Sequence, residues 1–584
     1  MRSGGGAKLG RRFLFWLVNY KNRFFILFRM TKTKTCAVSG KQFKVTDFDL
    51  AFYAKMGLSE PSLCPDERCR RRLGWQNMRK LYRRKCDATG KMMISNISQD
   101  KNLTVYDQNY WWSDKWDFRD YGQDFDFSRP FFEQWGELLA RVPQPCMLRN
   151  HWLDENCDYT NYAGNNKDCY LIFHADMNRD CLYGVGVKKC VNAVDVIHAH
   201  GSELLYECVD CRNGYNLRYS QNSENCSESW FLKNCIGCKN CFGCVNLRNK
   251  EYYFLNESLG KEAYEKKIKS LELQKYSSVK KLRDQYMEFL KQFPHRATEG
   301  YQNENCSGDQ VFRCQNVKEC FDVQESRDMR YCHRVYNGPN SDCMDMNEYG
   351  MQIQQVYEGL AIGINANNVI GGIYVNEQVS DICYGMHNHH SHDLFGCIGG
   401  VRGKYCILNK QYEKDAYFEL KEKIIAHMKK TGEWGEFFPL ELSPFGYNET
   451  VASEYFPLEK EEILARGLRW KEEEVNADYQ GAVYEIPDSI GDVGDDVLDK
   501  ILTCSVSGRN FRLTKLELGF YRQMQLPIPR VCSDERHNQR MKLRNARKLC
   551  DRECAECGET IRTTYEKDRP EKILCEKCYE KKLN

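Results

Sequence analysis

The stretch CSESWFLKNCIGCKNCFGC, at residues 226–244, sets the period of the central part of the chain. Cys226 and Cys244 are 18 residues apart with Cys235 midway, and the same step leads back to Cys208 and Cys190. The surrounding sequence is rich in Asn, Asp, Gly and Tyr and lacks helical periodicity. A nine- and eighteen-residue period therefore predicts a β-solenoid, in which each coil presents small inward residues to the next. The first cysteines are spaced by 12 instead, which leaves the register there open: Cys157, Cys169 and Cys181.

A second array, at about 301–409, repeats this plan less regularly. Its end matches the end of the first array at an offset of 153, where FGC at 242–244 corresponds to FGC at 395–397. We infer an internal duplication that gives two solenoid lobes. Charged, helix-forming stretches at 260–293 and 413–430 follow the lobes. We expect them to cover the open coil ends, because repeat arrays need polar caps to stay soluble.

The two ends of the chain carry the same small module. Residues 35–110 recur at 503–578 with a constant offset of 468 and without a gap. For example, CPDER at 64–68 corresponds to CSDER at 532–536. A residue that both copies keep serves both modules, whereas a difference shows what one copy has lost or replaced.

The C-terminal module contains a strong metal-binding pattern. Cys554-x2-Cys557 and Cys575-x2-Cys578 are separated by 17 residues, which matches a treble-clef zinc finger of the GATA type. In such a finger the first pair forms a knuckle and the second pair opens a short helix, so that four thiolates bind one Zn²⁺. We predict a structural zinc site here. The alternative, four reduced surface thiols, would leave a short tail with almost no core.

The upstream half of each module has a weaker version of this pattern. In the C-terminal copy a knuckle is followed by a cysteine and a histidine, and in the N-terminal copy a cysteine stands in place of the histidine. Zinc accepts Cys and His alike, so the exchange favours two further zinc sites, each with an unidentified fourth ligand. The alternative is a metal-free fold held by apolar residues. The candidate ligands are Cys504, Cys532 and His537, and Cys36, Cys64 and Cys69.

The N-terminal counterpart of the strong finger has lost three of its ligands. Cys86 remains, but Thr89, Asp107 and Tyr110 replace the other three cysteines. We therefore expect no zinc at this position. Three tryptophans follow directly, and a packed aromatic core could take the place of the metal: Trp111, Trp112 and Trp116.

One further cluster, Cys235-x2-Cys238-x2-Cys241-x2-Cys244, resembles the start of a bacterial ferredoxin motif. Its last gap is two residues rather than three, and no proline follows. The first and last cysteines also lie on the nine-residue period. We favour buried structural thiols, and two alternatives stay open: a zinc site and, less favoured, an iron–sulfur cluster.

Basic residues cluster in both modules where a treble clef places its helix. The net charge is only +3 over 584 residues, so nucleic acid would have to be bound through a local patch. Positions 68, 72, 79 and 83 fall on one face of a helix, and arginine is the preferred fork-shaped donor to phosphate. This pattern predicts nucleic-acid contacts, with RNA favoured; the alternative is a helix with acidic partners within the chain. The candidates are Arg68, Arg71, Arg72, Arg79, Lys80, Arg83, Arg84, Arg536, Arg540, Arg544, Arg547 and Lys548.

Three further segments are YWWSDKWD at 110–117, DFSRPFFEQ at 126–134 and LSPFGYNET at 442–450. They resemble an uncharacterised family of cysteine-rich zinc-ribbon proteins from reduced-genome bacteria, and the resemblance covers the chain from about residue 31. The family typically carries Cys at several positions where this chain does not, which implies degenerate fingers in the N-terminal module. These positions are Glu67, Thr89, Asp107 and Tyr110. The family has no assigned activity.

The sequence as a whole predicts a mainly β protein with α-helices, in which two β-solenoid lobes with helical caps are flanked by treble-clef modules. The apolar runs near the start are too short to span a bilayer and have no cleavage site. Without a secretion signal, the 31 cysteines favour metal sites or buried thiols over disulfides, and we expect a cytoplasmic protein without membrane contact. The expected units are an upstream extension (1–30), a degenerate double treble-clef module (31–130), a helical connector (131–149), solenoid lobe 1 (150–256), a helical cap (257–300), solenoid lobe 2 (301–409), a helical cap and linker (410–500) and the C-terminal zinc module (501–584).

For function, we expect a non-enzymatic zinc-binding scaffold that binds nucleic acid. A protein-interaction scaffold without nucleic acid is the first alternative, because solenoids offer long regular surfaces. A β-helix carbohydrate-active enzyme is the second. No spacing singles out an acid/base pair, and no Ser/His/Asp, phosphate-loop or dinucleotide pattern is present, so we do not expect catalysis. The sequence leaves protein partners open and does not specify the oligomeric state.

Overall fold

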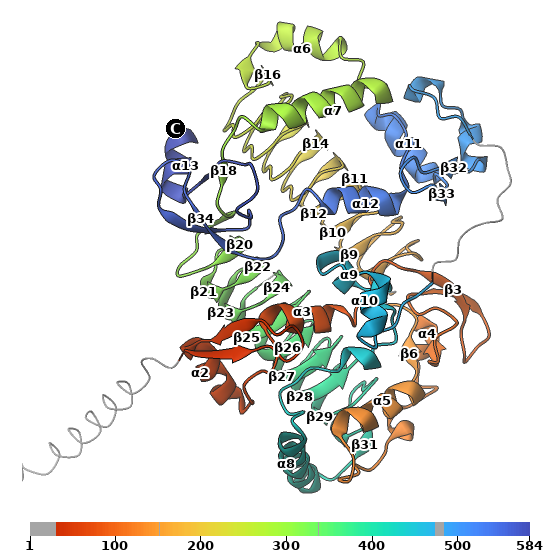
Figure 1. Cartoon of the computed structure of the whole chain (residues 1–584). Coiled ribbons are helices and arrows are strands. Elements are labelled where there is room, and N and C mark those ends of the chain that lie inside the picture. Colours follow the sequence, from red (N-terminus) through yellow and green to blue (C-terminus); the bar gives the residue numbers. More distant parts are fainter. Residues whose placement is uncertain (1–30, 151, 337, 473–483, 584) are drawn as a thin grey trace, which may run out of the picture.

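The computed structural model describes residues 31–150, 152–336, 338–472 and 484–583. They form a mainly β protein with some helix, and its centre is a β-solenoid of about 21 turns (Figure 1). The expected extension at 1–30 lies outside the described residues. None of the described helices combines the length and apolar character that crossing a membrane requires.

The first run of coils covers residues 149–254 and repeats every twelve residues. Strands β9 (Phe173–Asp176), β10 (Val185–Lys188) and β12 (Ile197–His200) stack in parallel with their first residues paired. The predicted nine- and eighteen-residue period is therefore wrong, and the spacing of 12 shown by the first cysteines is the coil length itself. The other strands of this run are β7 (Arg149–Asn150), β8 (Asn161–Gly164), β11 (Val191–Val194), β13 (Glu203–Tyr206), β14 (Tyr215–Arg218) and β15 (Ser227–Trp230).

A three-residue unit within each coil explains the misleading period. Residues with positive φ recur along the first run at multiples of three, and Asn213, Asn216, Asn222 and Asn225 have φ between 45° and 53°. Asn and Asp enter this left-handed region more readily than other side chains, which accounts for their abundance in the array. Three residues per side give a twelve-residue coil four sides. Because nine and eighteen are multiples of three, both spacings return a cysteine to the interior, but on different sides.

The second run of coils covers residues 300–411 and has longer turns. Strands β25 (Asn340–Asn347), β26 (Gln354–Leu360), β27 (Ala366–Ile373) and β28 (Val379–Met386) pair in parallel at a step of 13 residues. Branched apolar side chains are fully buried in this part of the run: Val356, Val369 and Ile382. The other strands are β19 (Gly300–Tyr301), β20 (Gly308–Phe312), β21 (Gln315–Lys318), β22 (Cys320–Gln324), β23 (Ser326–Arg330), β24 (His333–Val335), β29 (His392–Phe395), β30 (Lys404–Ile407) and β31 (Lys410–Gln411).

Helices form in both charged stretches that follow the coils. Helices α6 (Lys261–Lys269) and α7 (Tyr276–Leu290) connect the two runs, and α8 (Lys414–Thr431) follows the second. Tyr286 of α7 and Tyr417 of α8 are buried against aromatic side chains of the coils. Figure 1 shows α7 beside the last coils of the first run and α8 beside those of the second.

The two end modules fold into the same elements. Both copies contain a pair of helices followed by a hairpin, and the matched elements have bounds that differ by 468 at each end. The matched pairs are α2 (Asp47–Met56) with α11 (Lys515–Met524), α3 (Pro65–Leu73) with α12 (Ser533–Met541), β3 (Tyr82–Lys85) with β34 (Cys550–Glu553), and β4 (Met92–Ser95) with β35 (Thr560–Thr563). The sequence repeat is thus also a repeat of structure.

Short elements complete the periphery. Near the N-terminal module these are β1 (Lys32–Thr35), β2 (Gln42–Val45), β5 (Val105–Tyr106), α4 (Gln108–Trp111), α5 (Phe131–Arg141) and β6 (Gln144–Pro145). Elsewhere they are β16 (Tyr253–Phe254), β17 (Glu257–Ser258), β18 (His295–Arg296), α9 (Val451–Tyr455), α10 (Lys460–Ala465), β32 (Leu502–Thr503), β33 (Asn510–Phe511), β36 (Ile573–Leu574) and α13 (Glu576–Leu583). Strand β5 pairs with β6 just before the first run, and β36 pairs with β18 just before the second.

Candidate functional site

Four cysteines of the C-terminal module converge on one point. Cys554 and Cys557 lie between β34 and β35, and Cys575 and Cys578 lie at the beginning of α13. Their Sγ atoms are all within 4.8 Å of one another, and the sulfurs of Cys557 and Cys575 are 3.8 Å apart. With Zn–S bonds of about 2.3 Å, a tetrahedral zinc site has sulfur–sulfur edges of about 3.8 Å. This group could therefore hold one metal ion, as the sequence predicted.

The backbone around one of these thiols, that of Cys554, favours its charged form. The N–H of Cys575 donates to Sγ of Cys554 at 3.3 Å. Burial acts to raise the pKa of Cys554, but backbone N–H groups of Cys557, Cys575 and Glu556 outweigh it and lower the pKa to about 6. Cys554 is then mostly a thiolate at neutral pH, and the thiolate is the form that binds metals.

The weaker metal patterns do not converge. Nε2 of His537 lies 3.4 Å from a carboxylate oxygen of Glu454, and Sγ of Cys69 lies 3.4 Å from Nδ1 of His333. Each of these presumed third ligands therefore faces another part of the chain. Within the described residues, neither predicted set forms a group of three ligand atoms close enough for a metal ion. The two sets are Cys504, Cys532 and His537, and Cys36, Cys64 and Cys69.

The cysteines at 235–244 are interior side chains from the four sides of one coil. None is more than 1% exposed, and each Sγ donates to the carbonyl two residues before it. Burial raises the pKa of the Cys235 thiol well above its usual value, so this thiol stays protonated at neutral pH. Among the described residues, no three of these side chains form a group close enough to hold a metal ion: Cys235, Cys238, Cys241 and Cys244. The arrangement agrees with the structural-thiol interpretation.

Most of the basic residues predicted to contact phosphate are covered by the protein itself. Helix α3 ends at Leu73 and α12 at Met541, so the prediction of one helical face from position 68 to position 83 is wrong. The buried residues are Arg68, Arg72, Arg84, Arg536 and Arg540; the partly buried ones are Arg71, Arg79, Lys80, Arg544 and Arg547; the exposed ones are Arg83 and Lys548.

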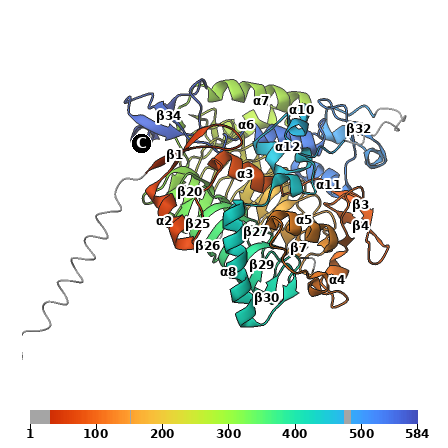
Figure 2. The same cartoon turned by 60° about the horizontal axis from the view of Figure 1, so that its bottom comes forward.

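An equivalent arginine fixes each module to a run of coils. Nε of Arg68 donates to Asp345 at 2.9 Å, and Nε of Arg536 donates to Asp195 at 2.6 Å. Each guanidinium also lies over a tyrosine ring, at 5.3 and 5.0 Å. These charged side chains are at most 3% exposed. Helix α3 of the N-terminal module thus docks on the second run and α12 of the C-terminal module on the first, and the two helices lie on the same side of the coils (Figure 2).

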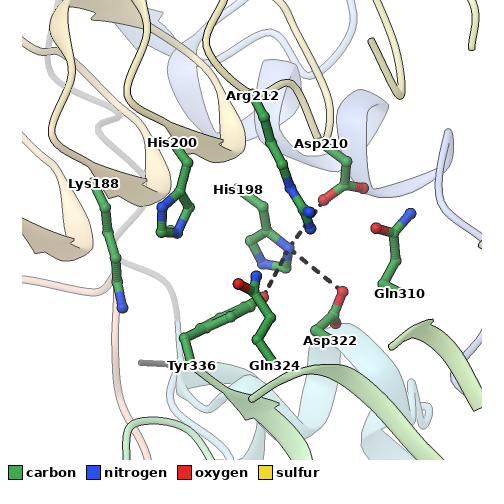
Figure 3. Close-up of a pocket in the computed structure, with 10 residues that line it drawn as sticks. Lys188, His198, His200, Asp210, Arg212, Gln310, Asp322, Gln324 and Tyr336 are labelled. Carbon is green, nitrogen blue, oxygen red and sulfur yellow. Dashed lines mark hydrogen bonds and ion pairs between the residues drawn. The ribbon is translucent and has the colours of Figure 1, made fainter. Parts of the chain in front are cut away.

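A polar cavity lies where the two runs face each other (Figure 3). Its volume is about 20 Å³, which is room for one water molecule or a small ion. The first run contributes Gly186, Lys188, His198, His200, Asp210 and Arg212, and the second contributes Gln310, Asp322, Gln324 and Tyr336. Sequence reasoning missed this site because its residues belong to no motif. Only the twelve-residue coil length reveals that three of its basic residues share one column.

Three of these residues have the spacing of metal ligands but are already paired. Nδ1 of His198 lies 3.1 Å from Asp210 and 3.7 Å from Asp322, and the three ligand atoms lie within 4.8 Å of one another. Arg544 approaches Asp322 at 2.6 Å and Asp210 at 3.2 Å, and Arg547 approaches Asp322 at 2.8 Å. Burial acts to raise the pKa of Asp322, but the two arginines hold it well below its usual range. Both carboxylates are therefore neutralised without a metal.

No protein-family model, curated protein or solved structure matches this chain. The fold and the site therefore define the class of the protein by themselves. It is a cysteine-rich β-solenoid protein with a four-thiol group that could hold a metal ion. The resemblance to a zinc-ribbon family stays an expectation.

Proposed function

We propose that the protein is a non-catalytic, zinc-binding scaffold in which the metal fixes the C-terminal module to the coils. The convergence of four thiols at zinc spacing carries this proposal. A zinc ion held by Cys554, Cys557, Cys575 and Cys578 would tie the β34–β35 hairpin to α13 in the manner of a treble clef. The adjacent strand β36 pairs with β18 at the start of the second run, so the metal would also stabilise that coil end.

Metal analysis of the purified full chain tests this proposal. We expect one zinc per chain in the wild type and none in Cys575→Ser, because loss of one thiolate opens a structural site. Cys550→Ser is the matched control, since this nearby thiol donates to the carbonyl of Thr563 and lies outside the four-thiol group. Zinc-free wild type, or iron with absorbance in the visible range, would refute zinc as the metal.

As a second function we propose binding of single-stranded RNA in a cleft between the two modules and the first run. The cleft measures about 460 Å³, and its lining combines basic and aromatic side chains, which suits phosphates and stacked bases. Arg83 is exposed there, and Tyr159 and Tyr170 are half-buried with their rings 5.1 Å apart. Phosphate contacts would then come from this cleft rather than from the arginines docked on the coils.

Fluorescence anisotropy with a short single-stranded RNA tests the second function. We expect Arg83→Glu to weaken binding and to reduce the salt slope by about 1. Lys44→Glu is the control, because it makes the same charge change at an exposed position of the same module and does not line the cleft. Equal binding by the two variants, or no binding at all, would leave the protein-interaction scaffold as the better proposal.

A further inference from the structure

Three basic side chains form one column along the first run. Lys188 of β10 pairs with His200 of β12, and His200 forms a parallel bridge with Arg212 on the next coil. Neighbouring coils lie about 4.8 Å apart, so the basic groups of Lys188 and Arg212 stand two coils apart with His200 between them. Asp176 pairs with Lys188 on the preceding coil. All three side chains line the cavity between the runs, and Figure 3 shows them entering it from the first run.

The ammonium group of Lys188 and the guanidinium group of Arg212 are available to bind a ligand. Lys188 is 5% exposed, and its Nζ has no hydrogen-bond partner among the described residues. It lies over the rings of Tyr336 and Tyr349 at 5.1 and 5.2 Å. The guanidinium of Arg212 lies 3.9 Å over the ring of Phe312, and the structure records no hydrogen bond from it to any described residue. A buried ammonium without a hydrogen bond is costly, so its retention points to a ligand.

The column next to these basic residues contains Gly186 and His198, and the glycine leaves the space that the cavity occupies. Gly186 has a φ of +72°, and a Cβ added there would come within 2.4 Å of the His198 ring. Any other residue at position 186 would therefore displace His198 or fill the cavity. Gln310 and Gln324 of the second run add amide groups to the opposite wall.

The surrounding charge favours an anion over a cation. The carboxylates that line the cavity, Asp210 and Asp322, are already engaged by Arg544 and Arg547. Among the described residues no carboxylate lies within ion-pair distance of Lys188 or Arg212, and Asp176 and Glu348 act on Lys188 from further away. Burial is the largest cause that lowers the pKa of His200 to about 3, and the positive charges of Lys188 and Arg212 lower it further. A bound metal would add to this positive charge.

We propose that the cavity between the two runs binds a small oxyanion, a carboxylate or phosphate group, through Lys188, His200 and Arg212. The ammonium and the guanidinium supply charge-assisted hydrogen bonds, and the imidazole donates when the anion is present. The limited volume admits only the charged end of a larger molecule, or a free inorganic anion. The site is independent of the four-thiol group and of the proposed RNA cleft.

Calorimetric titration of the full chain at fixed ionic strength tests this proposal, with inorganic phosphate and acetate as separate arms. We expect saturable binding of at least one; tighter phosphate binding identifies a phosphate-type site and tighter acetate binding a carboxylate-type site. Lys188→Met and Arg212→Gln should each weaken binding at least about tenfold, the cost of losing a hydrogen bond to a charged group. Lys189→Met is the matched control, because Lys189 is adjacent and exposed.

Thermal unfolding without added anion separates binding from folding. Lys188→Met should melt at or above the wild-type temperature, because it removes an ammonium that is buried without a hydrogen bond. Unsaturable titrations, or equal anion affinity in Lys188→Met and Lys189→Met, would overturn the proposal. Saturable Mn²⁺ binding that is lost in Asp210→Asn but kept in Cys575→Ser would replace it with a cation site.

Discussion

The second halves of the two end modules share one backbone plan but use different chemistry. In the C-terminal copy four thiols converge at metal spacing. In the N-terminal copy, at the matching positions, the N–H of Asp107 donates to Sγ of Cys86 at 3.3 Å and the hydroxyl of Thr89 donates to the Asp107 carboxylate at 3.2 Å. The same carboxylate accepts the N–H of Tyr110 at 3.0 Å. One aspartate thus connects the segments that the thiols would connect through a metal.

Aromatic packing distinguishes the copies further. After the N-terminal hairpin, the rings of Trp111 and Trp112 lie 4.8 Å apart and those of Trp111 and Trp116 lie 5.6 Å apart. Trp111 is 2% exposed and donates through its indole N–H to the carbonyl of Pro143 at 3.1 Å. Among its described residues, the apolar cluster of the C-terminal copy contains Tyr565 and Tyr579 but no tryptophan. In the N-terminal copy, the tryptophan cluster forms a local apolar core at the place where the C-terminal copy has its four thiols.

Removal of the metal should produce the largest difference in stability between the two copies. With excess chelator, the amides of 550–583 should lose most of their protection from hydrogen exchange, because the free energy of metal binding in such modules is largely folding free energy. The amides of 82–111 should keep theirs. Hydrogen exchange with mass spectrometry measures both regions in one sample, and equal loss in both would contradict the distinction.

Restoring the thiols should convert one copy into the other. The triple variant Thr89→Cys, Asp107→Cys, Tyr110→Cys completes a four-thiol set with Cys86, and we expect one additional zinc per chain by metal analysis. Adding Cys86→Ser to the triple variant is the control and should abolish the gain. An unchanged zinc content in the triple variant would show that the aromatic cluster holds the backbone away from metal geometry.

Substitution of the docking arginines should destabilise the two modules to the same extent. Arg68→Met and Arg536→Met should each lower the free energy of opening of their module by about 3–5 kcal/mol, because each removes the arginine that donates to a buried aspartate and leaves that charge with a single arginine, Arg72 or Arg540. Native-state hydrogen exchange of α3 and α12 measures this. Arg83→Met, at an exposed position, should change it by less than about 0.5 kcal/mol. A large effect in only one module would break the equivalence.

The smallest effect concerns Asp107. Asp107→Asn should destabilise the N-terminal module by about 1 kcal/mol, since it weakens charge-assisted bonds and a helix N-cap. Burial acts to raise the pKa of Asp107, but hydrogen bonds from Tyr110, Cys86 and Thr89 outweigh it, so the folded pKa lies below the usual value. The stabilisation is then present above the unfolded pKa and is lost as pH falls through the folded one. The difference from wild type should shrink accordingly in urea titrations at falling pH.

Local patterns predicted much of this molecule. The four-thiol group was found because a Cys-x2-Cys pair on each side of a hairpin is fixed by short-range geometry, and the solenoid was found because its inward cysteines recur. The coil length of the first run was missed, since every interval between its inward positions is a multiple of three and the sequence alone does not show which multiple closes a turn. Long-range partners were missed for another reason. Arg68 and Asp345 are separated by 277 residues, and the local sequence around one does not indicate the other as its partner.

The crossed docking of the modules has a consequence for synthesis on the ribosome. The fully buried carboxylate of Asp195, in the first run, is neutralised by Arg536, which lies 341 residues further along the chain. At about 5–20 residues per second, that arginine is made roughly 20–70 s after the coil it neutralises. Until then the nascent first run carries an aspartate whose partner does not yet exist. The C-terminal module therefore completes a coil of the first run, and a product truncated before Arg536 would lack that completion.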